Sequence, residues 1–529
     1  MPVAGGANVL RPDAQNPRQW VVGLPAVSAG NNAPRDALAL ACGLMNDLAK
    51  GRTVTADVVR GEVSKLVQRF RPLAPLGVNT LRFLEAAHEM GIPWCHVANN
   101  VYQFGWGRRA RWLDSSFTDE TSTISASLAR DKVACAKVLR SVGLPVPRHQ
   151  LVASADQAIK VAEALGYPVV VKPANLDGGF GVRACVRDAD AVQQAFDATF
   201  KLSKRVLVEQ FIVGNDYRVR VCKGEVIGAL IRRAAAVLGD GVSTVQALID
   251  RTNSARRKRK ANLDPQVEQG YAPITIDDEV HQWLAAQGLD LHGVVPAGQR
   301  VRLRGAANVN LGGTNWDVTR QAHPDNLALA VQAAAALRLD VAGVDLLLPD
   351  IARSWQETGG AICEVNAQPQ FSSGQAHREV LRLLVKGQGR IPVIAITGIS
   401  TNVDLEQTVV QCFLQEGVRI HWVTTPVKCL QALRRSDVDG LVWQMQAAPS
   451  SNMALPVDQL SLWIRQCGSE LGQGSGSFRQ VEAIWDLDES SAPERLADRL
   501  IAFLRGQIGS SDKGKSDGAT KSSHDLGGG

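Results

Sequence analysis

Two apolar stretches near residues 341–366 each carry polar side chains. The first, GVDLLL, holds Asp345 within an apolar strand, where a carboxylate is rarely buried without a partner. The second, AICEVN, is a short strand whose period of two points Glu364 and Asn366 to one face. Three oxygen ligands converge if the chain turns back between the strands. We therefore predict a Mg²⁺ site that Mn²⁺ can also fill, with two sheet-edge acids facing water as the alternative.

Length and composition indicate a multidomain globular protein. A chain of 529 residues should form roughly three domains. Its net charge of +6 suits anionic small molecules as well as a polyanion. Nine scattered cysteines without a CxxC pair predict reduced core residues. With no signal-peptide pattern and no apolar run of roughly 18 residues, we expect a cytoplasmic protein without a membrane partner.

Changes in composition divide the chain into four regions. Residues 1–128 form an N-terminal accessory domain, with helices expected over Ala37–Lys50, Ala56–Arg69 and Asn79–Met90. Residues 129–389 alternate helices with β-branched strands, as α/β and α+β domains do. Residues 390–508 begin with an apolar strand and continue with a helix over Leu405–Gln415. Residues 509–529 carry hardly any apolar side chain, and we expect a disordered tail.

Two lysines and a glycine-rich segment in the second region suit a bound nucleotide. Lys132 lies near the start of an amphipathic helix expected over residues 126–143, and Lys172 ends the strand YPVVVKPA. Both can hold α- and β-phosphates as point charges. The segment after Lys172 contains Gly178, Gly179 and Gly181, which can bring backbone amides close to phosphate oxygens. A simple hairpin is the alternative for this glycine segment.

The next strand can bind the nucleoside part. It covers Val206–Glu209 and runs into Gln210, Phe211 and Ile212. Backbone groups of such a segment can bind the edge of adenine, with Glu209 near the amino group. Asp216, seven residues after Glu209, can accept hydrogen bonds from ribose hydroxyls, although a turn residue within GNDY is the favoured alternative when this residue is taken alone.

Further cations and a polar loop are candidates for substrate handling. Arg232 and Arg233 at a strand end, and Arg304 in VRLRG, can bind phosphates or carboxylates, with surface arginines as the alternative. A loop expected over residues 308–319 can approach a transferring phosphate, and it supplies the substrate-binding candidates Asn308, Gly312, Gly313 and Thr314. The basic run 256–260 is expected in a solvated loop, or else in a funnel for acidic substrates. Without interleaved aromatic residues it predicts no nucleic-acid partner.

Taken in order, these segments resemble the ATP-grasp domain of the cyanophycin synthetase family, from about Val101 to Arg390. The runs LVEQFIVGNDYRV, AANVNLGGTNWDVT and GGAICEVNAQPQF carry the likeness, and GRIPVIAITG extends it to where that family passes into a Mur-ligase-like domain. The resemblance implies an α/β and α+β multidomain protein with an ATP-grasp fold. It also implies Lys132 and Lys172 on ATP phosphates, residues 209–212 on adenine, Asp216 on ribose, and Asp345, Glu364 and Asn366 on Mg²⁺.

The family's chemistry implies phosphorylation of a carboxylate by ATP, followed by attack of an amine to give an amide and ADP. Mg²⁺ and lysines offset charge on the transferring phosphoryl group, so no protein nucleophile is needed. Arg304 is the candidate for the arginine near the tetrahedral intermediate, with Arg232 or Arg233 in reserve. Amino acids or small peptides are the implied substrates, and the likeness favours a homo-oligomer.

Two departures from the family pattern bear on function. The glycine segment NLDGGFGV lacks the histidine of the cyanophycin enzymes, so phosphate or acceptor handling can differ. From Gly398 the chain reads GISTNVDL, where Val403, Asp404 and Leu405 replace the glycine, lysine and hydroxyl residue of a P-loop. An acid at the lysine position repels phosphate, and valine does not adopt the glycine conformation.

The third region is therefore expected to be a truncated, degenerate Mur-ligase-like P-loop domain. Only about 130 residues follow Gly398, too few for the further domains of a Mur ligase. We expect the region to brace the ATP-grasp domain or to mediate oligomerisation, with its tryptophans in the core. The predicted function is a single-step ATP-dependent carboxylate–amine ligase. The alternatives are a non-catalytic ATP-binding subunit or scaffold of a larger synthetase and a cyanophycin-type polymer synthetase.

Overall fold

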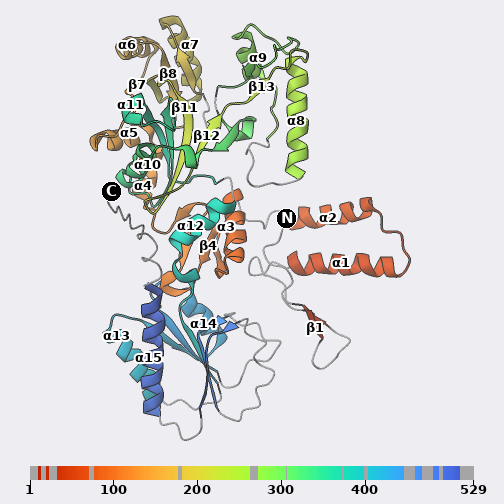
Figure 1. The fold of residues 1–529 in the computed structure, drawn as a ribbon, viewed down its shortest axis with the longest axis vertical. Coiled ribbons are helices and arrows are strands. Elements are labelled where there is room, and N and C mark those ends of the chain that lie inside the picture. The colour runs from red at the N-terminus through yellow and green to blue at the C-terminus, as the bar shows by residue number, and fades with distance from the viewer. Residues whose placement is uncertain are drawn as a thin grey trace, which may run out of the picture. The chain divides into compact units, whose positions relative to one another are not determined.

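The protein is represented by a computed structural model that describes residues 10–12, 20–22, 33–70, 77–176, 181–261, 272–305, 307–371, 374–397, 403–445, 459–466, 480–487 and 493–512. The chain forms two compact units, residues 116–380 and residues 1–115 together with 381–529 (Figure 1). The predicted domain boundaries at 128 and 389 differ from these limits and stay predictions. Within the described ranges, no helix is long and apolar enough to cross a membrane.

The first sheet of unit 116–380 is antiparallel and has the strand order β7-β10-β8-β9. Its strands are β7 (His149–Val152), β8 (Val169–Pro173), β9 (Arg183–Val186) and β10 (Val206–Gln210). The helices α6 (Ala155–Leu165) and α7 (Ala189–Leu202) pack against it around a core that includes Val171, Val208 and Phe196. Because β8 and β10 are its central strands, their polar side chains lie on the protected part of the sheet.

The second sheet has the strand order β15-β12-β11-β16-β17, and all its pairs are antiparallel. The strands are β11 (Asn215–Cys222), β12 (Glu225–Arg233), β15 (Thr314–Asp317), β16 (Val341–Leu348) and β17 (Ala361–Asn366). A hairpin turn at Lys223 and Gly224 joins β11 to β12, and both residues have positive φ, 51° and 79°. The turn therefore uses the left-handed conformations that a tight hairpin requires.

The two faces of this second sheet differ in polarity. Tyr217, Val219 and Val221 share a core with α4 (Thr123–Arg130), α5 (Lys132–Ser141) and α10 (Pro324–Ala336). Because side chains alternate along a strand, the residues between them lie on the opposite face. Those residues are charged, so one face carries the core and the other carries the ions.

A β-bulge in β17 sets which side chains reach the charged face. Leu346 pairs with Ile362, whereas the next residue, Asp345, pairs with Glu364, so Cys363 is the extra residue. Ile362 is in the core, and without the bulge Glu364 would share its face. The bulge moves Glu364 to the face of Asp345, and Asn366 follows it there.

The single helix predicted over residues 126–143 is wrong, because the chain forms two helices that meet at Asp131. The carboxylate of Asp131 accepts hydrogen bonds from the backbone N–H of Val133 at 3.0 Å and of Ala134 at 3.1 Å. This N-cap begins α5 at Lys132. The break thereby places the Lys132 side chain on the first turn of a helix.

We expect Asp131→Ala to destabilise the unit by about 1 kcal/mol, because the α5 cap is lost. The cap bonds and Arg205 lower the pKa of Asp131 despite the opposing effect of burial. The stabilisation is therefore present above about pH 3.9, the unfolded pKa, and is lost as the pH falls through the lowered folded value. Thermal unfolding at pH 7 and pH 3 measures both effects. Asp188→Ala, which removes the α7 cap, is the control: it should cost similar stability at pH 7.

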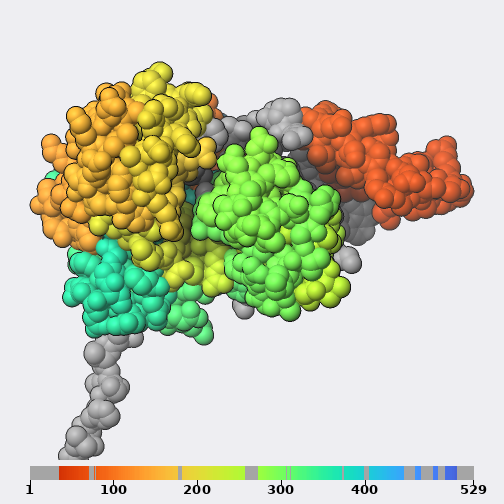
Figure 2. Space-filling model, turned by 90° about the horizontal axis from the view of Figure 1, so that it is seen from above, coloured from red at the N-terminus to blue at the C-terminus, as the bar shows by residue number. Residues whose placement is uncertain are grey.

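A smaller lobe follows β12. It contains β13 (Ala236–Leu238), α8 (Val245–Ala261), α9 (Asp278–Ala285) and β14 (Arg300–Arg302) around its own apolar core. Figure 2 shows this lobe in green beside the orange and yellow part of the unit. The solvated loop predicted for residues 256–260 is wrong, since α8 continues to Ala261. Arginine and lysine are good helix formers, and this propensity extends the helix through the basic run.

The remaining elements of unit 116–380 are short. They are β6 (Phe117–Thr118), the 3-10 turns η3 (Val309–Leu311) and η4 (Thr319–Gln321), and α11 (Trp355–Thr358). The loop predicted over residues 308–319 is wrong for Thr314–Asp317, which form the edge strand β15. Pairing with β12 overrides the turn-forming composition of this segment. Helix α12 (Gly374–Leu384) then leads the chain into the other unit.

The other unit begins with the strand pair β1 (Leu10–Pro12) and β2 (Trp20–Val22). The helices α1 (Ala33–Ala49), α2 (Ala56–Phe70) and α3 (Val78–Glu89) confirm the three predicted helices. The strands β3 (Trp94–Ala98), β4 (Val101–Phe104) and β5 (Arg111–Asp114) pair antiparallel. Between β4 and β5, η2 (Gly107–Arg109) lies close to η5 (Lys386–Gly389), since Trp106 N–H donates to the Gly389 carbonyl at 2.6 Å.

A parallel sheet of order β19-β20-β18-β22-β24 forms the C-terminal part of that unit. Its strands are β18 (Val393–Thr397), β19 (Ile420–Val423), β20 (Gly440–Met445), β22 (Leu462–Gln466) and β24 (Ile484–Leu487). The helices α13 (Val403–Gln415) and α15 (Pro493–Asp512) pack against one face of this sheet (Figure 1). Helix α14 (Pro426–Leu433) packs against the other face. A separate strand pair joins β21 (Gln459–Leu460) to β23 (Gln480–Val481). The α/β prediction for this region is confirmed.

The tryptophan and tail predictions for this region are partly correct. Trp443 and Trp463 are fully buried, whereas Trp422 and Trp485 are only partly buried at the edge of the core. The tail predicted from residue 509 begins too early, because α15 continues to Asp512. Residues 513–529 lie outside the described residues. Trp106 packs into the same core as Trp443, so the N-terminal and C-terminal parts of this unit share one core.

Candidate active site

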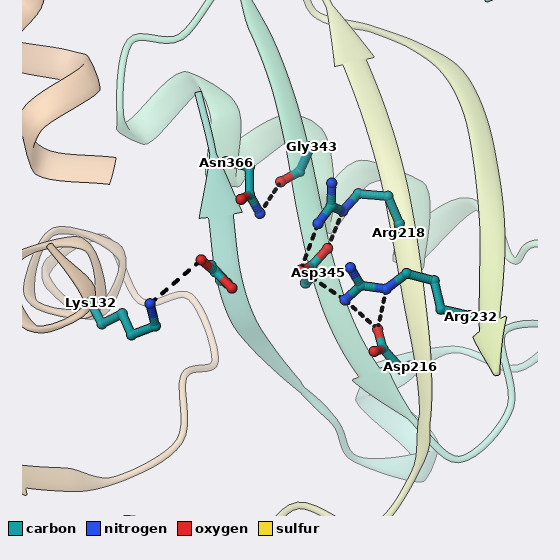
Figure 3. A network of polar contacts seen from close by, with 8 residues as sticks. Lys132, Asp216, Arg218, Arg232, Gly343, Asp345 and Asn366 are labelled. Carbon is teal, nitrogen blue, oxygen red and sulfur yellow. Dashed lines mark hydrogen bonds and ion pairs between the residues drawn. The ribbon is translucent and has the colours of Figure 1, made fainter. Parts of the chain in front are cut away.

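The charged face of the second sheet brings Asp345 between two arginines (Figure 3). Arg218 lies directly opposite Asp345 in the strand register, and its Nε and Nη2 donate to the two carboxylate oxygens, the second at 2.9 Å. Arg232 Nη2 reaches Asp345 Oδ2 at 2.8 Å. Only 3% of Asp345 is exposed, so this buried carboxylate has the partners that burial demands.

Arg232 also contacts a second carboxylate, that of Asp216. Its Nε and Nη2 lie 3.0 Å and 2.7 Å from Asp216 Oδ1. Burial alone would raise the pKa of Asp345, but Arg218 and Arg232 hold it below its usual value. Burial raises the pKa of Asp216, and the opposing effect of Arg232 only partly offsets it. The turn alternative for Asp216 is wrong, since the residue lies within β11.

Glu364 and Asn366 lie next to Asp345 on the neighbouring strand. Glu364 is the register partner of Asp345, and Asn366 Nδ2 lies 3.5 Å from the Gly343 carbonyl. Burial raises the pKa of Glu364, and the negative charge of Asp345 raises it further, whereas Lys132 lowers it. A cation between the two carboxylates would relieve this repulsion, and the Asn366 amide adds a third oxygen. The residues therefore fit a Mg²⁺ ion, although its binding stays a prediction.

A pocket at the edge of the same sheet contains both predicted phosphate lysines. Its lining includes Lys132, Lys172, Glu209 and Glu364, together with apolar side chains of α5. Lys132 Nζ donates to the Leu176 carbonyl at 2.8 Å and lies 3.7 Å from Glu364 Oε1. The pocket thus joins the predicted phosphate cations to the predicted metal ligands.

Lys172 and Glu209 form a buried ion pair across β8 and β10. Lys172 Nζ lies 2.7 Å from Glu209 Oε1, and their side chains are 6% and 7% exposed. Burial lowers the pKa of Lys172, but the Glu209 carboxylate raises it more, so the lysine stays charged. The Glu209 carboxylate therefore binds Lys172, while its predicted contact with an adenine amino group stays a prediction.

The pocket thiols are poor nucleophiles. Burial raises the pKa of Cys363 to about 12, and it does the same for Cys135 on α5. A thiolate is the reactive form of cysteine, so neither residue is suited to covalent catalysis at neutral pH. The site instead has the cations and carboxylates of a charge-stabilising mechanism.

The sequence of this chain is similar to those of known proteins. A family model described as D-ala D-ala ligase C-terminus matches residues 138–273. A cyanophycin synthetase from Trichormus variabilis is 31% identical over 414 residues, which cover 75% of this chain and 44% of that protein. The chain is thus similar in sequence to the cyanophycin synthetases over three quarters of its own length. The predicted resemblance and the predicted ATP-grasp fold are thereby confirmed.

More partial matches extend to enzymes named for glutathione. The glutathione biosynthesis bifunctional protein of Streptococcus mutans is 32% identical over 240 residues, covering 45% of this chain and 31% of that protein. A crystal structure of a bifunctional glutathione synthetase from Pasteurella multocida matches with a TM-score of 0.44 at 25% identity, covering 62% of this chain and 46% of that one. The matched part of the chain spans less than half the length of the cyanophycin synthetase from Trichormus variabilis.

The described residues cover only part of the predicted glycine segment, but all of the predicted adenine-binding segment 209–212. Gly181 has φ +73°, and a Cβ there would lie 2.9 Å from a Leu202 methyl, so a larger residue would be strained. Gly178 and Gly179 lie outside the described residues. Gln210 ends β10 and accepts from Arg148 Nε at 3.4 Å, and the partly buried Phe211 and Ile212 follow it.

Of the three predicted catalytic arginines, Arg232 is the one that contacts Asp345. Arg304 is 2% exposed and binds Asp277 at 2.7 Å and Glu279 at 2.8 Å, both at the start of α9. Arg233 is exposed at the end of β12. A catalytic role for Arg304 stays a prediction, but its two carboxylate partners give it a structural role in the smaller lobe.

The predicted substrate loop is tied to the smaller lobe. Gly313 N–H donates to the Asn308 carbonyl at 2.9 Å, and Gly312, with φ +88°, accepts from Arg256 Nη2 at 3.0 Å. Thr314 then pairs with Arg233 at the edge of the second sheet. The loop therefore connects the basic helix α8 to the strand that carries Arg232.

Sequence reasoning did not identify Arg218 and Arg220. Both share the face of Asp216, two and four residues farther along β11. Burial lowers the pKa of Arg220 to about 10, and the neighbouring Arg218 contributes to this shift. The alternation DYRVRV carried the signal, since polar residues at a spacing of two indicate a strand with one charged face.

Proposed function

We propose that this protein is an ATP-dependent carboxylate–amine ligase. It would join amino acids or a small peptide-like substrate by an amide bond, with an acylphosphate intermediate and ADP as product. Most weight rests on the position of Glu364, which lies 3.7 Å from Lys132 and opposite Asp345 in the register. Cations for phosphate and carboxylates for a metal ion are thus side by side, as phosphoryl transfer requires.

In this proposal the cationic residues bind phosphate groups and the carboxylates bind the metal ion. Lys132 and Lys172 would bind nucleotide phosphates, and Arg232 would lie near the transferring group. Glu364, Asp345 and Asn366 would hold Mg²⁺, which supplies neutralisation of the charge that develops on the phosphoryl oxygens. The chain's contribution is therefore to hold two anionic reactants close together and to offset their repulsion.

Release of ADP and phosphate tests this function. The full chain is incubated with ATP, Mg²⁺ and pairs of amino acids or dipeptides, and the product mass is measured. A product formed with loss of one water per bond supports a ligase. Nucleotide binding without turnover for every pair would reject the ligase and favour an ATP-binding subunit or scaffold.

A cyanophycin-type polymer synthetase is the second candidate, and the matches to that family favour it. The two candidates predict different products. A single-step ligase gives one product mass, whereas a polymer synthetase gives a ladder of masses. A cytoplasmic location and a homo-oligomeric state are part of the same proposal.

We expect Asp404→Ala to leave ligase turnover unchanged, because the residue is exposed on the first turn of α13 and would repel phosphate. The stability should fall by no more than about 1 kcal/mol, because an acid on the first turn of a helix interacts favourably with the helix dipole. Steady-state ADP release and thermal unfolding check both expectations. A large loss of turnover would show that the C-terminal α/β region takes part in the reaction.

A further inference from the structure

Arg232 is shared between two carboxylates, the buried Asp345 and the partly buried Asp216. Its Nη2 lies 2.7 Å from Asp216 Oδ1 and 2.8 Å from Asp345 Oδ2 (Figure 3). Its Nε adds a second bond to Asp216 at 3.0 Å. The guanidinium therefore has two places to bind, and Asp216 alone can hold it through two donors.

Both oxygens of Asp345 are engaged by guanidinium groups. Arg218 donates to each of them, and Arg232 adds a bond to Oδ2. A Mg²⁺ ion binds a carboxylate oxygen at roughly 2.0–2.1 Å, closer than a guanidinium nitrogen, and is repelled by a neighbouring cation. A divalent ion at Asp345 therefore meets the repulsion of two guanidinium groups, and the withdrawal of one of them favours its binding.

Geometry selects Arg232 as the arginine that withdraws. Arg218 lies directly opposite Asp345 in the register and grips both oxygens. Arg232 lies opposite Asp216 and reaches Asp345 on the diagonal. Withdrawal from Asp345 therefore costs Arg232 one bond and leaves its two bonds to Asp216 in place.

A second ion pair likewise joins a cation that can bind phosphate to a predicted metal ligand. Lys132, a predicted phosphate ligand, lies 3.7 Å from Glu364, a predicted metal ligand. A cation–nucleotide complex brings a divalent ion for the carboxylates and phosphate oxygens for Arg232 and Lys132. Each displaced cation then gains an anionic partner in the same step, whereas a metal ion alone would take Asp345 from Arg232 and Glu364 from Lys132 and give neither cation an anion in return.

We propose that Arg232 is an exchangeable counter-ion that closes Asp345 to free divalent cations and moves onto the polyphosphate when the metal arrives with a nucleotide. The metal and the nucleotide consequently bind as one complex. This inference rests on the proposed function, since it assumes that the site takes a metal–nucleotide complex.

Binding of Mn²⁺ to the full chain, measured by electron paramagnetic resonance of the free ion, tests the proposal without turnover. Wild-type protein should bind Mn²⁺ weakly alone and much more tightly with a non-hydrolysable ATP analogue. Arg232→Gln should bind Mn²⁺ alone about tenfold more tightly or better, since a charged hydrogen-bond competitor is gone. The same variant should bind the analogue less tightly. The two affinities should change in opposite directions because Arg232 competes with Mn²⁺ for Asp345 but binds the polyphosphate of the analogue.

Arg220→Gln is the matched control. Arg220 lies on the same face of β11, its guanidinium lies 5.8 Å from the Phe371 ring centroid, and its removal takes away one positive charge as well. If Arg220→Gln tightens Mn²⁺ binding as much as Arg232→Gln does, the loss of any nearby positive charge explains the effect and the exchange is refuted. Wild-type protein that binds Mn²⁺ equally well with and without the analogue would also refute it.

Arg232→Lys covers the case in which the glutamine variant does not fold. A lysine keeps the charge, but its single ammonium group cannot bridge two carboxylates as the planar guanidinium does. In Arg232→Lys, Mn²⁺ affinity should rise and analogue affinity should fall, and both changes should be smaller than in Arg232→Gln. Mn²⁺ binding that follows this pattern without ligase activity for any substrate pair would reject the proposed reaction but keep the exchange.

Discussion

Glu364→Gln is expected to abolish ATP-dependent ligase turnover, with a loss of about 10³-fold or more, because a metal ion contributes several kcal/mol to phosphoryl transfer. Glutamine has nearly the same shape, but it removes the negative charge beside Asp345. Because the pKa of Glu364 is raised by burial and by that neighbour, its charge destabilises the folded protein at neutral pH. The variant should therefore be inactive and at least as thermally stable as the wild type.

The combination of lost turnover and retained stability separates a metal ligand from a structural acid. ADP release and thermal unfolding are measured on the same preparations. Glu357→Gln, a change at an exposed residue of α11 that lies 3.7 Å from Arg353, should alter neither quantity. Turnover of Glu364→Gln within tenfold of the wild type would remove Glu364 from the predicted metal site.

The predictions that depended on strand periodicity were reliable. The alternation in AICEVN correctly placed Glu364 and Asn366 on one face, and the structure pairs β16 with β17 as expected. That face is shared with Asp345 only because Cys363 forms a bulge. A bulge depends on how two strands pair, and a single sequence does not reveal it.

The predictions that failed depended on competition between local and tertiary effects. The helix expected over residues 126–143 is divided because the Asp131 side chain caps a new helix, which periodicity alone does not reveal. The segment at Thr314 has turn-forming neighbours but pairs with β12. In both cases one specific contact decided the local structure.

The ionic partners were the least predictable part of the site. The predicted roles of Lys132, Lys172 and Glu364 stay predictions, although all three residues line one pocket. The pairing of Arg218 with Asp345 joins residues that are far apart in the chain. It follows from strand order, and strand order is a property of the whole sheet.

Lys172→Met is expected to lower the stability of the first sheet by about 3–5 kcal/mol, because it leaves the Glu209 carboxylate buried without its partner. The raised pKa of Lys172, caused mainly by the Glu209 carboxylate against the effect of burial, means that the lysine is charged at neutral pH. Its stabilisation is present below about pH 10.4, the unfolded value, and is lost as the pH rises through the folded value. Hydrogen exchange of the β8 and β10 amides measures this local stability, which global unfolding of two units would obscure.

The double variant Lys172→Met with Glu209→Leu separates the structural role of the pair from its role in binding. Replacing both ions by apolar side chains removes the unpaired charge, so most of the lost protection of β8 and β10 should return. Nucleotide affinity should not return, because the predicted phosphate cation is still missing. If affinity recovers together with stability, Lys172 only supports the sheet. If the single variant keeps wild-type protection, the ion pair does not stabilise the sheet and the buried charges must be solvated in another way.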